Sequence, residues 1–480
     1  FTGFTIVGLP DSTIRESKDR IRSAIENSGF EFPPKNFVVN LAPAGFKKQG
    51  SNFDLPIAIS LLHSYDYIPI EPKSIPMVGE LSLDGSVKPV KGIISMAITL
   101  LNSGYKSIIV PYNNRYEASA IKELNVYPVK NINDAISALE KKIEPFSDKS
   151  PSHNTPQYNT DFSDVKGQES AKRALEIAAA GHHNIILYGP PGSGKTMLVK
   201  RVQTILPPLT RAQAIETTMI HSTGGNLKNG NGLIRIPPFR APHHTSSDVA
   251  LVGGGQVPSV GEVSLSHNGI LFLDEFVEFK NNVIQALRQP LEDNEITISR
   301  AWGSHVFPTD FMLVAASNPC QCGYLFDNEI ACTCTPYRVK QYLQKIAGPI
   351  IDRIDIELLV NRVNYKDLTE QKKHENSHDI RERIIKARKL QKDRFINSPT
   401  KYNSRMTLED VKQFCKISTA TESVLEMAME RMNLTARSFF KILKVSRTIA
   451  DLDNSENIKK NHILEALSYK NLYKNYGYIN

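Results

Sequence analysis

The sequence lacks the features that mark membrane-spanning and secreted proteins. No run of residues approaches the roughly 20 consecutive apolar positions of a transmembrane helix, which excludes an integral membrane protein of that kind. Residues 1–20 have neither a basic start nor a long apolar segment, so they predict no secretory signal peptide; because the chain does not begin with Met, we expect its natural N-terminus to lie upstream. Five cysteines in 480 residues are too few for a disulfide-stapled extracellular scaffold. These absences favour a cytoplasmic protein.

Composition and charge are those of an ordinary globular protein with several domains. Hydrophobic residues make up 40% and charged residues 22%, and the net charge is +8. The positive excess is concentrated in residues 361–405, where Ile380, Ile384, Ala387 and Leu390 recur at helical spacing between basic residues. Two interpretations stay open for this segment. We favour a solvated helix face whose apolar stripe packs on the body, and the other is a surface that meets nucleic-acid phosphates.

Periodicity divides the chain into three folded regions and a linker. Residues 1–143 alternate short apolar runs with helical stretches, which predicts an α+β domain. Residues 144–161 are rich in Pro, Ser, Asn and Thr and indicate a linker. Residues 162–365 alternate strand and helix patterns around Gly-rich loops, as a parallel sheet does, and residues 366–480 have helical periodicity only. The predicted fold class is therefore α/β and multidomain.

The most specific motif is a phosphate-binding loop that follows a buried apolar strand. The strand IILY at 185–188 runs into GPPGSGKT, which fits this loop at every fixed position. Glycines let backbone N–H groups turn inward around phosphates at a helix N-terminus. Lys195 is expected to reach the β- and γ-phosphates of ATP, and Thr196 to contribute its hydroxyl to Mg²⁺. The predicted loop residues are Gly189, Pro190, Pro191, Gly192, Ser193, Gly194, Lys195 and Thr196.

Two later strands end in the polar groups that such a loop requires. The apolar strand at 270–273 ends in Asp274, expected to hold the Mg²⁺ shell, and in Glu275, expected to polarise the attacking water as general base. The strand FMLVAASN ends at Asn318, whose side chain can orient that water. Together with the loop, these residues predict an ATP hydrolase.

Three arginines are candidates for contact with the nucleotide. Arg353 lies between two aspartates in a turn before a strand, an exposed position suited to the γ-phosphate of a neighbouring subunit. Arg437 begins a helix and can reach the nucleotide of its own chain or of a neighbour. Structural salt bridging is the alternative for both, and it is the favoured interpretation for Arg447.

Four of the five cysteines form a compact cluster. Cys320 and Cys322 make one Cys-x-Cys pair, and Cys332 and Cys334 make the second one nearby. Four thiolates can complete a tetrahedral Zn²⁺ shell, so we predict a structural zinc site with no open position. Free thiols and a redox pair are the alternatives. Cys415 stands alone in a helical pattern and is predicted to lie in the core.

Two loop regions are candidates for contact with a polymer. The segment ITISRAWGSHVFPTDF predicts a hairpin with Trp302 at its tip, where the indole can stack on a base or fold back on the protein. The candidate DNA contacts are Arg300, Trp302 and His305. Residues 221–262 form the second region, which contains His243 and His244. We do not favour a metal site there, because no acidic or Cys partner lies at suitable spacing.

Five segments carry a resemblance to a known family. They are the phosphate loop, FRAPHHTSSDVALVGGG, GEVSLSHNGILFLDEF, NPCQCGY with CTCTPYRV, and TARSFFKILKVSRTIADL. They look like the magnesium-chelatase-like AAA+ proteins of the ComM, or YifB, type. The opening FTIVGLPDSTIRESKDRIRSAIENSGFEFPP with SNFDLPIAISLL resembles that family's N-terminal domain, which is similar to the Lon protease and ribosomal S5 fold. The resemblance covers nearly the whole chain and implies a Lon/S5-like domain at 1–143, an AAA+ core at 162–365 and a helical lid at 366–480.

The resemblance implies a function for the whole chain. Family members form rings, expected to be hexameric, that hydrolyse ATP with Mg²⁺. ComM-like members are DNA helicases that drive branch migration while taken-up DNA recombines during natural transformation. The implied partners are single-stranded and branched DNA and further copies of this chain, with no membrane. Two alternatives stay open. One is the motor subunit of a magnesium chelatase, although such subunits lack the Lon-like domain and this cysteine cluster. The other is an ATP-dependent remodeller of protein complexes.

The family's motifs map onto individual residues of this chain. Lys195 and Thr196 match the Walker A pair, Asp274 and Glu275 match Walker B, Asn318 matches sensor 1, Arg353 the arginine finger and Arg437 sensor 2. Trp302 stands where the family usually has a small residue, and Val260 where it tends to have Pro. Neither difference touches ATP chemistry, but Trp302 leaves the role of the hairpin open.

The Lon-like region lacks the peptidase pair of its namesake. Lon peptidases use a Ser nucleophile that a Lys activates. This chain has Phe53 at the nucleophile position, and the later segment KGIISMA has no matching lysine. Proteolysis is therefore not expected, and the region is better interpreted as a module for ring assembly or DNA docking.

Overall fold

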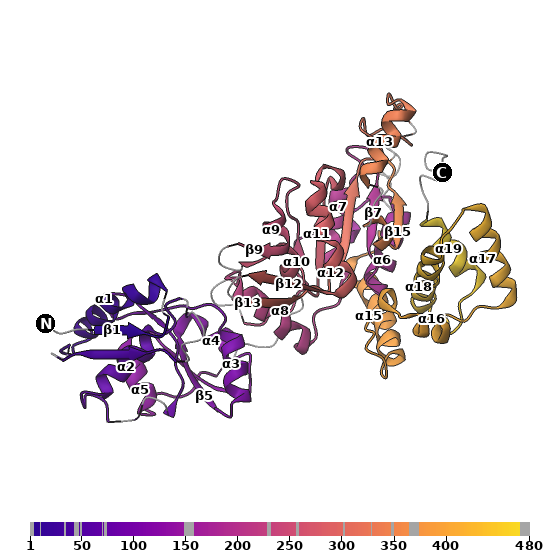
Figure 1. Ribbon diagram of the computed structural model, residues 1–480. Helices are drawn as coiled ribbons and strands as arrows, with labels where there is room; N and C mark the ends of the chain where they lie inside the picture. Colours follow the sequence, from indigo (N-terminus) through magenta and orange to yellow (C-terminus); the bar gives the residue numbers. More distant parts are fainter. Residues whose placement is uncertain are drawn as a thin grey trace. The chain divides into compact units, whose positions relative to one another are not determined.

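The chain folds into two compact units. The computed structural model describes residues 4–9, 11–32, 35–42, 48, 50–69, 71, 74–147, 158–227, 232–255, 259–300, 303–327, 329–346, 350–363 and 374–470 (Figure 1). The first unit comprises Phe1–Asn154, Thr210–Arg235 and Arg300–Gly303, and the second comprises Thr155–Leu209, Ile236–Ser299 and Ser304–Asn480. Among the residues described, no helix is both long enough and apolar enough to span a bilayer.

The first unit combines short strand pairs with helices. Its elements are β1 (Phe4–Val7), α1 (Ser12–Asn27), β2 (Phe37–Asn40), α2 (Asp54–His63), β3 (Glu80–Leu81), β4 (Val87–Lys88), α3 (Ile93–Asn102), β5 (Ser107–Pro111), α4 (Arg115–Ala118), β6 (Asn125–Val129) and α5 (Ile132–Leu139). The pairs β1–β2 and β5–β6 are parallel, and β3–β4 is antiparallel. Asp11 starts α1 by accepting the N–H of Ile14 at 2.9 Å, and the buried Ile21 and Leu55 join α1 and α2 in one core.

Helix α8 (Arg211–Thr223) belongs to the first unit, although its sequence lies inside the predicted 162–365 region. Its apolar side chains Ile215 and Met219 pack with the residues of α3. The hydroxyl of Ser222 accepts the N–H of Gly92 at 2.8 Å and donates to the carboxylate of Glu117. These partners hold α8 on the first unit, and a sequence pattern that reports only local periodicity does not reveal them.

A parallel five-stranded sheet organises the second unit. Its strand order is β15 (Ile356–Leu359), β7 (Ile185–Tyr188), β14 (Met312–Ser317), β11 (Ile270–Leu273) and β8 (Phe239–Arg240). All four neighbouring pairs are parallel, which confirms the parallel α/β sheet expected from the sequence. Because helices cover both faces, the strands β7, β11 and β14 are buried throughout.

Each face of this sheet has its own core. On one face, α6 (Glu169–Gly181), α7 (Lys195–Ile205), α15 (Ser377–Arg394) and α18 (Ala436–Leu452) pack on side chains such as Ile185 and Phe272. On the other face, α11 (Asn281–Ala286), α12 (Arg288–Asp293) and α13 (Pro336–Ile346) pack on side chains such as Ile186 and Leu271. The remaining elements are α9 (Asp248–Val252), β9 (Gly253–Gly254), β10 (Ser259–Val260), α10 (Glu262–Leu265), β12 (Glu295–Arg300) and β13 (Gly303–Pro308).

The C-terminal part is helical, as expected. Together with α15 and α18 it contains α16 (Leu408–Phe414), α17 (Thr419–Arg431) and α19 (Lys460–Ser468), and the helices α16 to α19 gather in one group, drawn in yellow in Figure 1. The buried Ile380, Ile384 and Ala387 confirm that most of the apolar stripe of α15 packs on the body, whereas Leu390, predicted in the same stripe, is exposed.

The basic residues of α15 help to fasten this helix. Arg383 Nε lies 2.6 Å from Glu176 Oε1, Arg388 Nη2 donates to the Ala179 carbonyl at 2.7 Å, and Arg394 Nη2 lies 2.5 Å from Asp451 Oδ1. Asp451 also pairs with the buried Arg447, whose guanidinium donates to two backbone carbonyls as well. These four arginines therefore stabilise the fold, whereas Lys386, Lys389 and Lys392 of the same helix are exposed.

Candidate functional site

The phosphate loop joins the carboxyl end of β7 to the first turn of α7. Gly192 and Gly194 have φ values of 77° and 85°, a left-handed conformation that side-chain-bearing residues rarely adopt. A Cβ atom on Gly189 would lie 2.3 Å from the carbonyl oxygen of Val360. The loop therefore requires glycine at these positions to adopt its conformation. It leads into the N-terminus of α7, where backbone N–H groups and the helix dipole favour a bound anion.

Lys195 lies inside this loop. Its Nζ donates to the carbonyls of Gly189 at 2.6 Å and Pro190 at 3.0 Å, and it is 3.4 Å from Asn318 Oδ1. Burial lowers the pKa of Lys195 to about 8, and the nearby Asp274 carboxylate opposes this shift. The ammonium is thus placed where phosphate oxygens would replace neutral carbonyls as its partners.

The end of β11 meets the first turn of α7. Thr196 Oγ1 donates to Asp274 Oδ2 at 2.7 Å, and the other carboxylate oxygen of Asp274 accepts the N–H of Glu275 at 3.0 Å. A hydroxyl and a carboxylate that face each other offer the hard oxygen ligands that Mg²⁺ takes in nucleotide sites. The donor set therefore fits the metal expected from the sequence.

Glu275 has a partner that the sequence did not reveal. Its carboxylate oxygen Oε2 lies 3.0 Å from Nδ1 of His244, and its side chain is 59% exposed. Its backbone is left-handed, with φ 52°. His244 comes from the loop after β8, far from Glu275 in sequence, and only the parallel pairing of β8 with β11 brings the two loops together.

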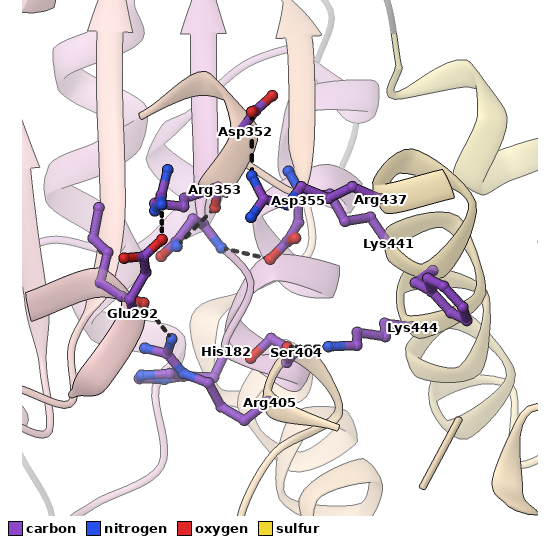
Figure 2. A pocket seen from close by; sticks show the side chains of 13 residues that line it. His182, Glu292, Asp352, Arg353, Asp355, Ser404, Arg405, Arg437, Lys441 and Lys444 are labelled. Atoms are coloured by element: carbon purple, nitrogen blue, oxygen red, sulfur yellow. Dashed lines mark hydrogen bonds and ion pairs between the residues drawn. The ribbon is translucent and has the colours of Figure 1, made fainter. Parts of the chain in front are cut away.

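The two arginines predicted to contact a nucleotide, Arg353 and Arg437, lie together at another place (Figure 2). Arg353 ends a short 3₁₀ turn, Ile351–Arg353, and Ile354 and Asp355 separate it from β15. Arg437 Nη1 lies 3.2 Å from Asp352 Oδ2. Arg437 is 55% exposed. The side chain of Arg353 is only 9% exposed and is ion-paired with Glu292 of α12. The expectation of an exposed Arg353 is therefore wrong, because α12 supplies a carboxylate that holds the guanidinium against the body.

The sheet separates these arginines from the phosphate loop of their own chain. Ile356 of β15 is in register with Ile185 of β7, so Arg353 lies at the amino ends of the strands, whereas the loop leaves the carboxyl end of β7. The four residues of β7 span roughly 13 Å. Arg353 and Arg437 line a cavity of about 340 Å³ at that amino edge, together with His182, Arg405, Lys441 and Lys444.

Two lysines support the turn that carries Arg353. Lys441 Nζ and Lys470 Nζ both donate to the carbonyl of Ile354, at 2.7 and 3.1 Å, and Asn184 Nδ2 donates to the carbonyl of Arg353 at 2.9 Å. Burial, together with the positive charge of Lys470, lowers the pKa of Lys441 to about 7. These hydrogen bonds to the carbonyls of Arg353 and Ile354 thus hold the backbone of the turn in place.

The buried amine of Lys441 predicts a pH dependence of stability. An unfolded lysine keeps its proton until a pH near 10.5, whereas folded Lys441 loses it near pH 7, so the unfolded state binds more protons between these values. Raising the pH therefore favours the folded state. Relative to Lys441→Met, the wild type should gain on the order of 1 kcal/mol of unfolding free energy from about pH 7 to about pH 9 in denaturant titrations. Parallel curves for the two proteins would contradict this.

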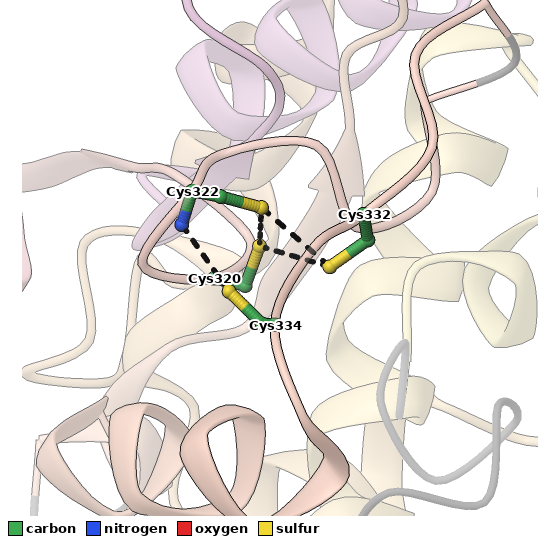
Figure 3. A group of neighbouring side chains, drawn as sticks. All are labelled: Cys320, Cys322, Cys332 and Cys334. Carbon is green, nitrogen blue, oxygen red and sulfur yellow. Dashed lines mark hydrogen bonds between the residues drawn. The ribbon is translucent and has the colours of Figure 1, made fainter.

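The four clustered cysteines converge as a metal site requires (Figure 3). Among the residues described, they are the one group of three or more His, Cys, Asp or Glu side chains that can share a metal ion, with ligand atoms within 4.8 Å of one another. The Sγ atoms of Cys320, Cys322 and Cys332 lie 3.3 to 3.7 Å apart. Sulfurs of a tetrahedral zinc site are about 3.8 Å apart, from Zn–S bonds of about 2.3 Å. The geometry therefore fits Zn²⁺.

Loss of one cysteine tests the zinc prediction. Purified wild type should contain about one zinc per chain, measured by elemental analysis, and Cys332→Ser should fall well below that ratio because three thiolates bind the ion more weakly. Cys415→Ser is the matched control, because Cys415 is buried in the helical region away from the cluster. Equal zinc contents in all three proteins, or none in any, would overturn the assignment.

The candidate DNA contacts are only partly described. β12 and β13 form a two-stranded sheet, which confirms the hairpin expected from the sequence. His305 is exposed on β13. Trp302 and the side chain of Arg300 lie outside the described residues. The structure therefore supports the hairpin, with His305 exposed, and its DNA contacts stay a prediction.

Comparisons with known proteins cover nearly the whole chain. Residues 1–114 match the family described as "Subunit ChlI of Mg-chelatase", residues 161–368 "Magnesium chelatase, subunit ChlI", and residues 374–470 "Magnesium chelatase, subunit ChlI C-terminal". Competence protein ComM of Haemophilus influenzae is 40% identical over 475 residues, which cover 98% of this chain and 92% of that protein. The uncharacterized protein YifB of Escherichia coli is 40% identical over 98% of this chain and 91% of its own length. Lon protease 2 of Bacillus subtilis is 26% identical over 32% of each chain.

Proposed function

This chain belongs to the magnesium-chelatase-like AAA+ proteins of the ComM/YifB type, and we propose that it is a ring-forming ATPase that drives branch migration of DNA during natural transformation. Membership of this family suggests ATPase activity. The proposed role in branch migration during natural transformation rests on the full-length similarity to a protein named for competence. We further propose a hexamer that acts on single-stranded and branched DNA.

The nucleotide site supports hydrolysis by a water molecule. In this proposal, Lys195 binds the β- and γ-phosphates, and Thr196 and Asp274 hold Mg²⁺, which neutralises charge on the phosphate oxygens when bound. Glu275 accepts a proton from the attacking water while the oxygen of that water bonds to the γ-phosphorus and the bond from the γ-phosphorus to ADP breaks. Asn318 orients the water. The approach of Lys195 to Asn318 and of Thr196 to Asp274 supports these roles.

The placement of the arginines supports a site shared between subunits. Arg353 and Arg437 lie at the amino edge of the sheet, and β7 separates them from the loop of their own chain. In a ring, that edge faces the nucleotide of the neighbouring subunit. We propose that Arg353 acts there as the arginine finger and that Arg437 acts in trans beside it, which leaves each subunit inactive alone.

The proposed domain layout follows the family. Residues 1–143 form the Lon/S5-like domain, 144–161 the linker, 162–365 the AAA+ core with a structural zinc site, and 366–480 the helical lid. The similarity to Lon protease 2 supports a Lon-like region. The Ser and Lys expected of a Lon peptidase do not match the residues of this chain. Phe53 precedes the first turn of α2, and the nearby Ser51 donates its hydroxyl to the carboxylate of Glu80. We propose that this domain assembles the ring or docks DNA.

Binding to branched DNA tests this function against its rival. The family descriptions name a magnesium chelatase subunit, which favours a porphyrin-directed motor as the second candidate. A DNA motor should bind a labelled three-way junction, and its affinity should fall steeply with salt as phosphate counterions are released. A chelatase motor or a remodeller of protein complexes should show no such binding at any salt concentration.

A further inference from the structure

A cavity of about 420 Å³ lies in the helical C-terminal region. Its walls are the last turns of α15, the end of α16, the last turns of α18 and the turn that follows α18. None of the residues that line it belongs to the phosphate loop, to the ends of the parallel strands or to the cysteine cluster. Its volume lies in the range of pockets that hold small organic molecules. The proposed ATP chemistry therefore gives this cavity no role.

One wall of the cavity consists of charges that neutralise one another. Asp451, which is fully buried, pairs with Arg394 at 2.5 Å and with Arg447 at 3.1 Å. Arg447 also donates to the carbonyls of Ser455 and Glu456, at 2.6 Å each. These bonds hold the turn after α18 against the helix, so the wall is rigid. Because its charges are already engaged, other side chains must hold a ligand.

The opening of the cavity presents amides beside apolar surface. In the part of the chain that the structure describes, no hydrogen bond or ion pair engages the side chains of Gln413, Asn454 and Asn457, which are all exposed. Each amide offers both donors and an acceptor. Leu390 is exposed and Phe414 is half-buried in the same lining. A flat ring with polar atoms along its edge, such as a nucleobase, satisfies both kinds of surface.

Exposed lysines lie next to this opening. Lys416 lines the cavity, and Lys386 and Lys389 precede Leu390 on α15 by one turn and by one residue. The lining itself contains three cations and two carboxylates, so its net charge is only +1. A phosphate ion alone is therefore a poor fit for the cavity. The lysines around it instead suit the phosphates on either side of an inserted base.

We propose that this cavity binds one unstacked nucleotide of a DNA single strand. The base lies against the two apolar side chains, its edge bonds to the three amides, and the neighbouring phosphates contact Lys416 and the lysines of α15. A paired base inside a duplex cannot enter, because it is stacked between its neighbours. The inference rests on the proposed function for the identity of the polymer, and it assigns the C-terminal helices a direct contact with the strand.

Binding of a labelled single-stranded oligonucleotide to the full chain, followed by fluorescence anisotropy, tests the base contact. Gln413→Ala combined with Asn457→Ala removes two exposed amides and leaves the charged wall intact. Its affinity should be about tenfold lower than that of the wild type, the scale of one base contact. An abasic strand of the same length keeps the phosphates, so both proteins should bind it equally. A double variant that binds the ordinary strand like the wild type, or that loses both strands equally, would overturn the inference.

Lys416→Gln tests the phosphate contact. Loss of one phosphate contact should weaken binding at low salt and make the slope of log affinity against log salt shallower by about 0.7, the value per phosphate of a single strand. Lys401→Gln is the matched control, because Lys401 is exposed in the same helical region and does not line the cavity. It should keep the wild-type slope. Equal slopes for the wild type and Lys416→Gln would contradict the phosphate contact.

Thymidine monophosphate distinguishes a strand from a free nucleotide. At millimolar concentration it should leave the strand bound, because it lacks the neighbouring phosphates that the lysines contact. If it displaces the strand from the wild type, the cavity is a site for a free nucleotide and the inference is wrong. All variants should unfold at the wild-type temperature, since the substituted side chains are exposed. If the wild type binds no single strand at any salt concentration, the proposed function fails together with the inference.

Discussion

Arg353→Ala is expected to lower kcat for ATP hydrolysis by about 10³- to 10⁵-fold, the range found when an arginine finger is removed. The reason is that the guanidinium stabilises charge that develops on the γ-phosphate in the transition state. In the proposed ring the nucleotide concerned belongs to the neighbouring subunit, because Arg353 lies at the opposite edge of the sheet from its own phosphate loop. Steady-state release of phosphate measures the effect.

The matched control for this variant is Glu292→Gln. It removes the carboxylate that pairs with Arg353 but keeps the arginine, so activity should be retained. Both variants should be compared with wild type by thermal unfolding, since Arg353 is largely buried against α12. If the unfolding is alike and Arg353→Ala stays within tenfold of wild type, the finger assignment is wrong.

Glu275→Gln is expected to lower kcat by about 10²- to 10⁴-fold, the usual contribution of a general base. An amide of the same shape keeps the contacts of the side chain but cannot take a proton from water at neutral pH. ATP should still bind, because Lys195 and the loop backbone are intact; equilibrium binding of a fluorescent ATP analogue checks this. Glu278→Gln, an exposed carboxylate on the same turn, should behave like wild type. Equal losses in both variants would contradict the role of Glu275.

A mixture of the two inactive variants separates action in trans from action in cis. Glu275→Gln subunits keep their fingers, and Arg353→Ala subunits keep their bases. If the finger acts in trans, about one quarter of the interfaces in a randomly mixed ring combine an intact base with an intact finger. The mixture should then regain activity that neither variant has alone. A mixture as inactive as its components would place both groups in one subunit.

Local sequence patterns predicted the parts of the site that lie on consecutive residues. The loop from Gly189 to Thr196 follows its strand directly, and Asp274 ends the next apolar strand, so parallel strands bring them to one edge. The paired cysteines were found in the same way, because their spacing already confines the four sulfurs to a short loop. Patterns of this kind suffice where the chain itself limits the distance between groups.

Features that depend on tertiary packing were not predicted. The burial of Arg353 depends on Glu292, which α12 brings from a distant part of the sequence. The contact of His244 with Glu275 depends on which strand lies next to β11. Helix α8 has an ordinary amphipathic pattern, and only its partners on α3 and α4 assign it to the first unit. In each case the missing information is the identity of a neighbour, which periodicity does not contain.

The most direct measurement is the ATP-dependent migration of a labelled three-way DNA junction, followed by the appearance of the resolved product on a native gel. We expect conversion by the wild type with ATP and Mg²⁺, and no conversion by Glu275→Gln under the same conditions. An intact ATPase that leaves the junction unconverted and is indifferent to DNA would contradict it, and the remodeller or the chelatase motor would take its place.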